Sequence, residues 1–280
     1  MSPRNSVGVA STHDSRVDLL SPAAEEILLE LTRELALATP APRYDPFYGL
    51  DRPAGPSLRV LDHLTRHGDF RKYVVVLDAN AGLGGVARWL TLRYGCRVVA
   101  LDPRPRVVAA GVRLTHRARL AGRVLGVAGA PTAIAARDGV FTQIWSVEAL
   151  HPPATRRRVL AELFRVLRPG SPIALQEVVR RAPSVPALRG AWETGTLEEY
   201  REDLVSVGFR QVEDEDVTAG RAEASSIVLS ARARLEQWLG DRLPADDPWH
   251  AAAIERRRIE DVVTGPDYRV VHLFARRPSV

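Results

Sequence analysis

A short apolar run passes directly into a glycine-rich turn in Val75-Val76-Leu77-Asp78-Ala79-Asn80-Ala81-Gly82-Leu83-Gly84-Gly85. Residues 73–77 are almost wholly apolar, which is typical of a strand covered on both faces. The small residues that follow let the backbone approach a ligand closely. They open a helix over about 84–94, whose first N–H groups have no helical partner. The segment therefore predicts a strand, a tight turn and a helix, the repeating unit of an α/β protein.

The same alternation continues along the chain. We expect further strands at 97–101, 123–128, 141–146, 172–177, 209–213 and 268–275, with helices at 105–121, near 131–136, 154–167 and 196–207. Strands and helices at this spacing form a parallel sheet with helices on both faces, and right-handed crossovers make it doubly wound. The sequence thus predicts a Rossmann-like α/β fold with a seven-stranded sheet.

The rest of the chain is expected to flank this sheet. Residues 1–20 lack periodicity and predict a flexible N-terminal arm, and residues 21–72 predict N-terminal helices with a proline-rich lid loop at 39–56. The main domain then occupies residues 73–280. It carries a helical cap insertion at about 218–265, with helices expected at 221–239 and 248–263.

The composition is that of a globular protein with a core. Of 280 residues, 45% are hydrophobic and 26% charged. The 39 lysines and arginines exceed the 34 acidic residues by five, a mild excess that does not indicate a nucleic-acid partner. A single cysteine, Cys96, excludes an intrachain disulfide, and neither a leader nor a membrane span is indicated. These features predict a cytoplasmic protein.

Two carboxylates mark a binding site at the strand ends. Ligands of doubly wound sheets bind beyond the carboxyl ends of the strands, where the strand order switches. Asp102 ends the second strand, where it could accept from both hydroxyls of a ribose, and Asp78 ends the first. Together with the turn, Asp102 predicts a nucleoside-containing cofactor. The alternative is a tight turn that binds no ligand.

The identity of the nucleoside depends on Asp78. Gly82, Gly84 and Ala87 satisfy the G-x-G-x-x-A pattern of dinucleotide sites, which leaves a nicotinamide or flavin oxidoreductase as one alternative. Asp78, four residues before Gly82, would repel a pyrophosphate but would attract a cationic methionine tail. The pattern therefore favours S-adenosylmethionine.

At this point the chain resembles class I S-adenosylmethionine-dependent methyltransferases. Beside residues 75–85, the similar segments are Arg88-Trp89-Leu90, Tyr94-Gly95-Cys96-Arg97, Leu101-Asp102, 145–151, 165–170, 197–200 and 208–209. The subgroup that it resembles methylates small molecules: glycine betaine precursors such as sarcosine and dimethylglycine, phosphoethanolamine, and ubiquinone or menaquinone rings. The resemblance covers about residues 57–276.

The resemblance implies a set of cofactor-binding residues. They are Asp78, Ala79, Asn80, Ala81, Gly82, Asp102, Pro103, Ala130, Pro131 and Ser146. Asn80 stands where the family usually has glycine, which reduces the room for the methionine carboxylate. Ala130 and Pro131 stand where an aspartate usually accepts from the adenine amine.

Methyl transfer from a sulfonium is an in-line displacement, so most of the rate can come from positioning. His151 and Glu148 are the candidate catalytic residues, because a base is needed when the acceptor carries a proton. A loop histidine can equally be a packing residue. The acceptor is expected to be a small molecule, either an amine or a phenol or quinone-type ring.

Four residues are candidates to line the acceptor pocket: Glu177, Tyr44, Tyr48 and Trp192. The glutamate would attract a cationic acceptor but could instead pair with an arginine. The aromatic residues could bind a cation or anchor the lid. No metal is expected, because no His/Cys cluster has metal-ligand spacing.

Two further alternatives stay open. Asn80 and Ala130 are compatible with a non-catalytic methyltransferase-like subunit that supports a partner enzyme. Nucleic-acid methylation is disfavoured, because the chain lacks the Asn/Asp-Pro-Pro-aromatic motif of amino-methylating nucleic-acid enzymes. The sequence does not distinguish a homodimer from a heteromeric assembly.

Overall fold

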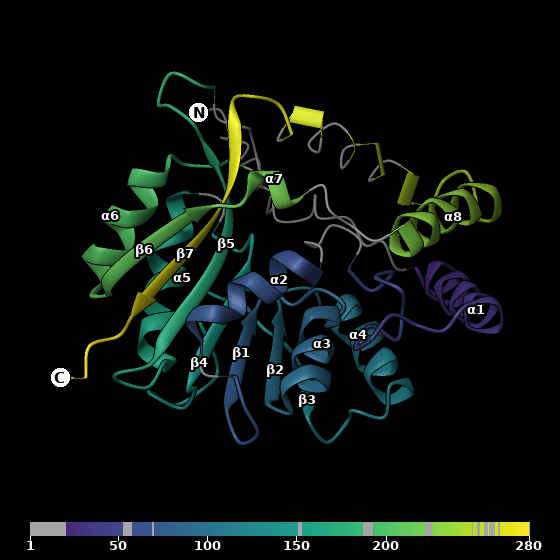
Figure 1. Ribbon diagram of the computed structural model, residues 1–280, viewed down its shortest axis with the longest axis horizontal. Coiled ribbons are helices and arrows are strands. Elements are labelled where there is room, and N and C mark those ends of the chain that lie inside the picture. The colour runs from purple at the N-terminus through teal and green to yellow at the C-terminus, as the bar shows by residue number, and fades with distance from the viewer. Residues whose placement is uncertain are drawn as a thin grey trace, which may run out of the picture.

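A seven-stranded sheet is the centre of the computed structural model (Figure 1). The structure describes residues 21–52, 58–68, 70–150, 153–186, 193–221, 226–247 and 264–279, together with 249–250, 253–254, 257 and 261–262. The strands are β1 (Val75–Ala79), β2 (Arg97–Asp102), β3 (Val124–Ala128), β4 (Gln143–Val147), β5 (Pro172–Arg180), β6 (Arg210–Asp216) and β7 (Tyr268–Arg276). Their order in the sheet is β3-β2-β1-β4-β5-β7-β6, which confirms the expected doubly wound, seven-stranded fold.

The strand order switches between β1 and β4, which fixes where a ligand can bind. Leu77 of β1 pairs in parallel register with Val99 of β2 on one side and Ile144 of β4 on the other. The chain leaves β1 toward β2 and β3 and returns to the opposite side of β1 through β4. The carboxyl ends of β1, β2 and β4 therefore meet around the switch point.

The expectation of a parallel sheet was wrong for the last strand, β7. β7 runs antiparallel to both β5 and β6 (Figure 1). Residues 270–275 of β7 are all buried, and a buried strand has the same apolar pattern in either direction. Strand direction was therefore not readable from the residues.

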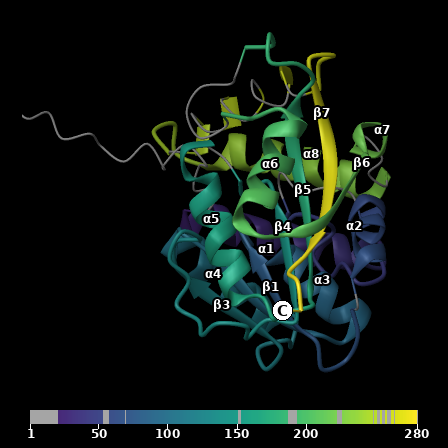
Figure 2. The same ribbon diagram turned by 90° about the vertical axis from the view of Figure 1, so that its left-hand side faces the viewer.

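Helices cover both faces of the sheet (Figure 2). On one face, α5 (Pro153–Val166) and α6 (Leu197–Val207) bury Leu160, Leu163 and Leu204 in the main core cluster. On the other face, α2 (Leu58–Leu64), η1 (Thr65–His67) and α3 (Gly85–Tyr94) pack Leu61 and Trp89 against the strands. α4 (Pro105–Arg117) contacts β2 and β3.

A separate apolar cluster joins the N-terminal segment to the connection between β6 and β7. That connection begins with α7 (Thr218–Arg221) and continues into α8 (Ser226–Arg242), which packs on α1 (Pro22–Ala38). Leu31 of α1 and Ala231 of α8 are fully buried, and Tyr48 of the lid loop joins them. Most of the helix expected at 248–263 lies outside the described residues, as does the arm at 1–20.

The short helix expected near 131–136 was also wrong, because these residues form turns. Side chains of α5 take the hydrogen-bonding groups that a helix would use internally. Glu162 accepts from the Ile134 N–H at 2.7 Å, and Arg165 donates to the carbonyls of Ile134 and Ala136 at 2.8 Å each. The segment is thus held by contacts with residues distant in sequence. The periodicity of apolar residues within the segment cannot predict such contacts.

Candidate active site

Asp78 lies at the carboxyl end of β1 with an unusual environment for a carboxylate. Its side chain is buried, and its Oδ2 atom has no hydrogen-bond partner among the described residues. Burial, and then the nearby charge of Asp102, raise the pKa of Asp78 to about 7. A buried carboxylate oxygen without a donor is costly, which indicates that a donor or a cation belongs beside it.

The turn after β1 is held against the end of β2. The N–H groups of Asn80 and Ala81 both donate to the Leu101 carbonyl at 2.9 Å. Asn80 has φ 89° and Gly84 has φ 75°, a left-handed conformation in which Gly84 caps α3. Glycine and asparagine are the residues that tolerate this region, so the turn keeps its shape although Asn80 replaces a glycine.

Asp102 is fully buried at the end of β2, and its four acceptor positions are all used. Its Oδ2 accepts from the Gly82 N–H at 3.0 Å and from Arg104 Nη2 at 3.0 Å. Its Oδ1 accepts from the Arg104 N–H at 3.0 Å and from Arg104 Nε at 2.9 Å. A ribose can therefore reach Asp102 only if the Arg104 guanidinium moves away, while the two backbone bonds can remain.

The Asn80 side chain bridges the switch point. Its amide nitrogen donates to the Val147 carbonyl at 2.9 Å and to the Glu148 carbonyl at 3.2 Å, both at the end of β4. Beside it, Ser146 Oγ donates to the Ala79 carbonyl at 2.8 Å and ties β4 to β1. The amide thus satisfies carbonyls that a ligand ammonium group could otherwise use.

Glu148 and Glu177 end up in different environments. Glu148 has φ 53°, is buried, and its N–H donates to the Gln176 carbonyl at 2.7 Å. Glu177 is fully buried, and its Oε1 accepts from the N–H groups of Ala149 and Leu150 at 3.1 and 3.3 Å. The described contacts of Glu177 therefore hold the loop after β4, and its expected role toward an acceptor stays a prediction.

The remaining candidate residues lie in two places, after β3 near Asp102 and in the lid loop. Ala130 and Pro131 follow β3, next to Asp102, whose carbonyl accepts from the Gly129 N–H at 3.0 Å. Tyr48 is fully buried, and its hydroxyl donates to the Thr39 carbonyl. Tyr44 lines a different pocket, with Asp62 and Trp89 beside α3.

The structure therefore brings nine candidate residues together at the carboxyl ends of β1, β2 and β4, with Ala130 and Pro131 beside them at the end of β3. The nine are Asp78, Ala79, Asn80, Ala81, Gly82, Asp102, Pro103, Ser146 and Glu148. It does not bring Tyr44 to them, and it uses Tyr48 as a core residue. His151 and Trp192 lie outside the described residues.

Sequence reasoning missed a buried network of charges that fixes the lid loop over the turn. Asp51 Oδ2 accepts from Arg88 Nη2 at 2.7 Å, and Asp45 Oδ2 accepts from Arg52 Nη2 at 2.7 Å. All four side chains are at most 6% exposed. A Cβ on Gly85 would lie 2.5 Å from Arg52 Cγ, so the lid loop presses directly on the start of α3. The available signal was Arg88, a charged residue within the apolar run of α3.

No group of three or more His, Cys, Asp or Glu side chains that could hold a metal was found in the described part of the chain. None of the helices described is long and apolar enough to cross a membrane.

The strand order, the acid at the end of β2 and the turn after β1 define a doubly wound protein with a nucleoside-type site at its switch point. Residues 77–175 match the family described as a methyltransferase domain. The resemblance to class I methyltransferases is thus confirmed for this segment.

Curated relatives match about half of the chain. A sarcosine/dimethylglycine N-methyltransferase of Halorhodospira halochloris is 35% identical over 151 residues, covering 51% of this chain and 54% of the relative. A sterol 24-C-methyltransferase of Eremothecium gossypii is 28% identical over 155 residues, covering 51% and 42%. The chain therefore spans about half, or less, of the length of these relatives.

Solved structures share the fold over most of the chain. The [4+2]-cyclase SpnF aligns with a TM-score of 0.65 and 20% identity, covering 91% of this chain and 94% of that one. A phosphoethanolamine N-methyltransferase 2 of Haemonchus contortus, in complex with S-adenosyl-L-methionine, aligns with a TM-score of 0.68 and 17% identity, covering 97% and 61%. At these identities the likeness shows the fold alone.

Proposed function

We propose that this protein transfers a methyl group from S-adenosylmethionine to a small-molecule acceptor. The observation that carries the proposal is the pair of buried carboxylates at the switch point. Asp102 lies at the end of β2, and Asp78 lies at the end of β1 with an oxygen that has no donor among the described residues. These two acceptor groups fit a ligand with a sugar diol at one end and a cationic amino-acid tail at the other. The methyltransferase domain at 77–175 supports the same cofactor.

The protein's own contribution is binding and alignment. Asp102 would accept from the ribose hydroxyls after Arg104 has swung away, and ionised Asp78 would attract the cationic tail. When bound, S-adenosylmethionine supplies an electrophilic methyl group on a sulfonium. Holding the acceptor in line with that methyl group provides most of the rate, and Glu148 or His151 would accept a proton from a protonated acceptor.

The acceptor belongs to one of two classes in this proposal, an amine or a phenol or quinone-type ring. The sarcosine/dimethylglycine N-methyltransferase among the relatives supports an amine. The matching 2-methyl-6-phytyl-1,4-hydroquinone methyltransferase of Synechocystis supports a ring. A panel of both classes, assayed for S-adenosylhomocysteine release, distinguishes them.

A non-catalytic supporting subunit is the second candidate, and Asn80 favours it. The Asn80 amide already donates to two carbonyls at the end of β4, so a bound amino-acid tail must displace it or share those acceptors.

Isothermal titration calorimetry with S-adenosylmethionine and S-adenosylhomocysteine tests the proposal. Saturable binding of both ligands, with methylated product from the acceptor panel, is the expected result. The absence of heat at millimolar ligand would refute the enzymatic proposal and leave the supporting subunit.

Two further assignments belong to the proposal. We assign the protein to the cytoplasm, because its single cysteine, Cys96, is buried and free and suits a reducing compartment. We also propose that it acts as a homodimer or with a partner chain, which light scattering of the purified protein will show.

A further inference from the structure

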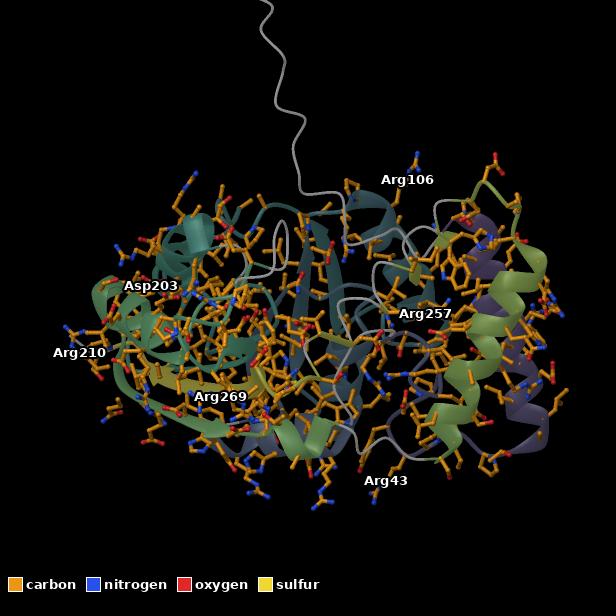
Figure 3. The ribbon with its side chains drawn as sticks, turned by 90° about the horizontal axis from the view of Figure 1, so that it is seen from above. Arg43, Arg106, Asp203, Arg210, Arg257 and Arg269 are labelled. Carbon is orange, nitrogen blue, oxygen red and sulfur yellow. The ribbon has the colours of Figure 1, made fainter. Side chains whose placement is uncertain are left out.

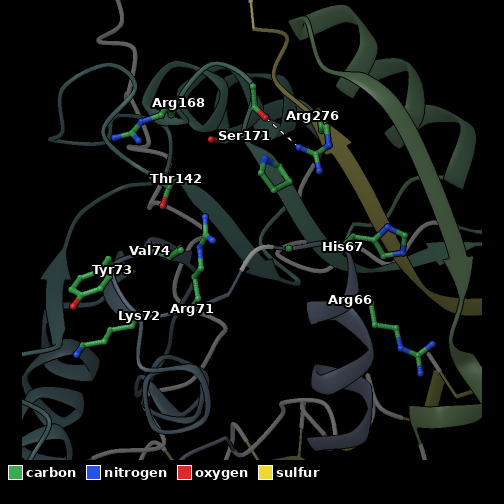
Figure 4. A pocket seen from close by; sticks show the side chains of 13 residues that line it. Arg66, His67, Arg71, Lys72, Tyr73, Val74, Thr142, Arg168, Ser171 and Arg276 are labelled. Carbon is green, nitrogen blue, oxygen red and sulfur yellow. Dashed lines mark hydrogen bonds between the residues drawn. The ribbon is translucent and has the colours of Figure 1, made fainter.

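A second pocket lies at the opposite edge of the sheet from the candidate active site (Figure 4). Val74 precedes β1, Thr142 precedes β4, Pro172 begins β5 and Arg276 ends the antiparallel β7. These are the amino ends of the parallel strands. A five-residue strand such as β1 places the two edges on the order of 15 Å apart. The pocket is therefore separate from the site around Asp78 and Asp102.

The lining of this pocket is strongly cationic. Its charged members are Arg66, Arg71, Lys72, Arg168 and Arg276, and His67 lies beside them. None of the described lining residues carries a carboxylate. In Figure 4, Arg71 and Arg276 extend toward the middle of the pocket, whereas Arg66, Lys72 and Arg168 extend outward from its rim.

Two acids of β6 contact histidines beside this lining. Glu213 approaches His67 Nδ1 at 3.7 Å, and Glu215 binds His63 of α2. Arg276 donates to the Gly170 carbonyl at 3.2 Å, which is a neutral acceptor. Among the described residues, Arg168 and Lys72 form no ion pair with an acid, whereas the charge of Arg66 helps to lower the pKa of Glu215. Like charges that gather in a concave surface raise the local potential and attract anions.

This concentration of charge is local. The chain as a whole has a net charge of only +5, and its acidic residues pair with arginines over much of the surface. Seen from above, Arg43, Arg106 and Arg210 lie on separate sides of the molecule (Figure 3). The five cations that line this pocket are therefore more than the overall composition of the chain predicts for a set of this size.

The turn before β1 presents two of the lining residues in a strained conformation. The Val74 N–H donates to the Arg71 carbonyl at 3.1 Å, which closes a turn with Lys72 and Tyr73 at its tip. Tyr73 has φ 79°, where this kind of turn prefers glycine or asparagine, and its side chain is 81% exposed. Lys72 is the only lysine of the chain. The turn holds a cation and an aromatic ring at the rim.

We propose that this pocket binds a small anion with two or more phosphate groups. Guanidinium groups match phosphate oxygens with paired N–H bonds, and several cations favour a ligand with several negative charges. The pocket has a volume of about 960 Å³, which is the size range of small-molecule sites and distinguishes it from the open face that a nucleic acid needs.

Calorimetry with inorganic tripolyphosphate at about 0.15 M salt tests the site. The wild-type protein should bind one equivalent saturably. Arg71→Ala/Arg276→Ala should weaken binding by ~10-fold or more, and the rim variant Lys72→Ala/Arg168→Ala by about 3-fold to 10-fold. The rim variant keeps the test valid if the first variant fails to fold, because Lys72 and Arg168 make no described hydrogen bond through their side chains.

A matched control removes the same charge elsewhere. Arg33→Ala/Arg117→Ala deletes two cations of α1 and α4 that lie outside the pocket, and it should change affinity by less than about 2-fold. A loss in this control equal to that of the pocket variants would overturn the proposal, since it would show only general charge attraction. The absence of saturable binding to the wild type would overturn it as well.

Binding of three other ligands, compared with that of tripolyphosphate, tests which chemical class the pocket prefers. ATP that binds more tightly than tripolyphosphate would support a nucleotide whose base contacts Tyr73, and equal affinity would support the phosphates alone. Citrate that binds as tightly as tripolyphosphate would contradict a phosphate site, and so would tighter binding of a single-stranded oligonucleotide. S-adenosylmethionine should bind all the pocket variants as it binds the wild type, so failure of this proposal is distinguishable from failure of the methyltransferase proposal.

Discussion

The two edges of the sheet carry opposite charge. At the carboxyl edge, Asp78 and Asp102 are buried beside a turn of small residues. At the amino edge, five cations surround an open pocket with no described acid in its lining. The two proposals thus place a cationic, sugar-bearing ligand at one end of the sheet and an anion at the other.

The edges also differ in how they are covered. The lid loop closes over the carboxyl edge through Asp51, which binds Arg88 in the first turn of α3, and through Asp45, which binds Arg52. At the amino edge, Arg71 and Arg276 extend into a pocket, and Arg66, Lys72 and Arg168 extend outward from its rim. The carboxyl edge is therefore stabilised by buried tertiary ion pairs, whereas the amino edge gathers cations around a pocket.

The largest expected effect comes from breaking the clamp. Asp51→Ala should lower the free energy of unfolding by about 3–5 kcal/mol, because it leaves the buried Arg88 guanidinium without its counter-charge. Chemical denaturation measures this loss. Asp51→Ala/Arg88→Leu should recover most of it, and exposed Asp246→Ala should change stability by less than about 0.5 kcal/mol. A small effect of Asp51→Ala would show that the clamp contributes little.

Asp102→Ala should separate the two edges functionally. It removes the acceptor proposed for the ribose, so S-adenosylmethionine affinity should fall by about 10-fold to 100-fold. Tripolyphosphate affinity should stay within about 2-fold of the wild type, since the two sites lie at opposite ends of the strands. Calorimetry with both ligands on one preparation gives both values. Equal loss of both ligands would mean that the variant is misfolded or that the sites are coupled.

The sequence predicted the position of the acids because that depends on local pattern. Asp78 and Asp102 follow apolar runs, and parallel strands bring their carboxyl ends to one edge. Strands β1 to β5 and β7 were likewise predictable from apolar runs separated by helices, whereas β6 is a charged and largely exposed strand. The antiparallel direction of β7 was not predictable, because a strand buried on both faces has the same composition in either direction.

The partners of the site residues were not predictable. Arg104 folds back onto Asp102, Glu177 binds the backbone of the loop after β4, and Asp51 reaches Arg88 over a separation of 37 residues. Each contact depends either on the packing of elements distant in sequence or on a side-chain rotamer. The periodicity of apolar residues in the sequence predicts neither. The residue types indicated which functional groups are present at the site. Tertiary packing determined which partners those groups bind.

The pH dependence of cofactor binding should report the charge of the carboxyl edge. The pKa of Asp78 is raised to about 7, mainly by burial, so the carboxylate is mostly protonated at pH 6 and mostly ionised at pH 8. A cationic ligand favours the ionised form, and S-adenosylmethionine affinity should therefore rise by about 10-fold between these values. Below pH 7, binding should release a proton from Asp78. The heat of binding measured by calorimetry should then depend on the ionisation enthalpy of the buffer.

Asp78→Asn is the control for this titration. It keeps the shape of the side chain and removes the charge, so the remaining pH dependence belongs to the ligand itself. An unchanged pH profile in this variant would show that Asp78 does not face the cationic tail.

The smallest expected effect concerns Arg104, whose side chain pairs with Asp102 at the carboxyl edge. Its guanidinium makes two bonds to Asp102 that a ribose must replace, whereas the backbone bonds from Gly82 and Arg104 can stay. Because the Arg104 side chain is 24% exposed, water can solvate it after displacement, and the net cost is small. Arg104→Ala should therefore tighten S-adenosylmethionine binding by about 2-fold to 5-fold. Weaker binding in calorimetry would instead show that Arg104 contacts the cofactor, and the acidic edge would then require a cation of its own to complete the site.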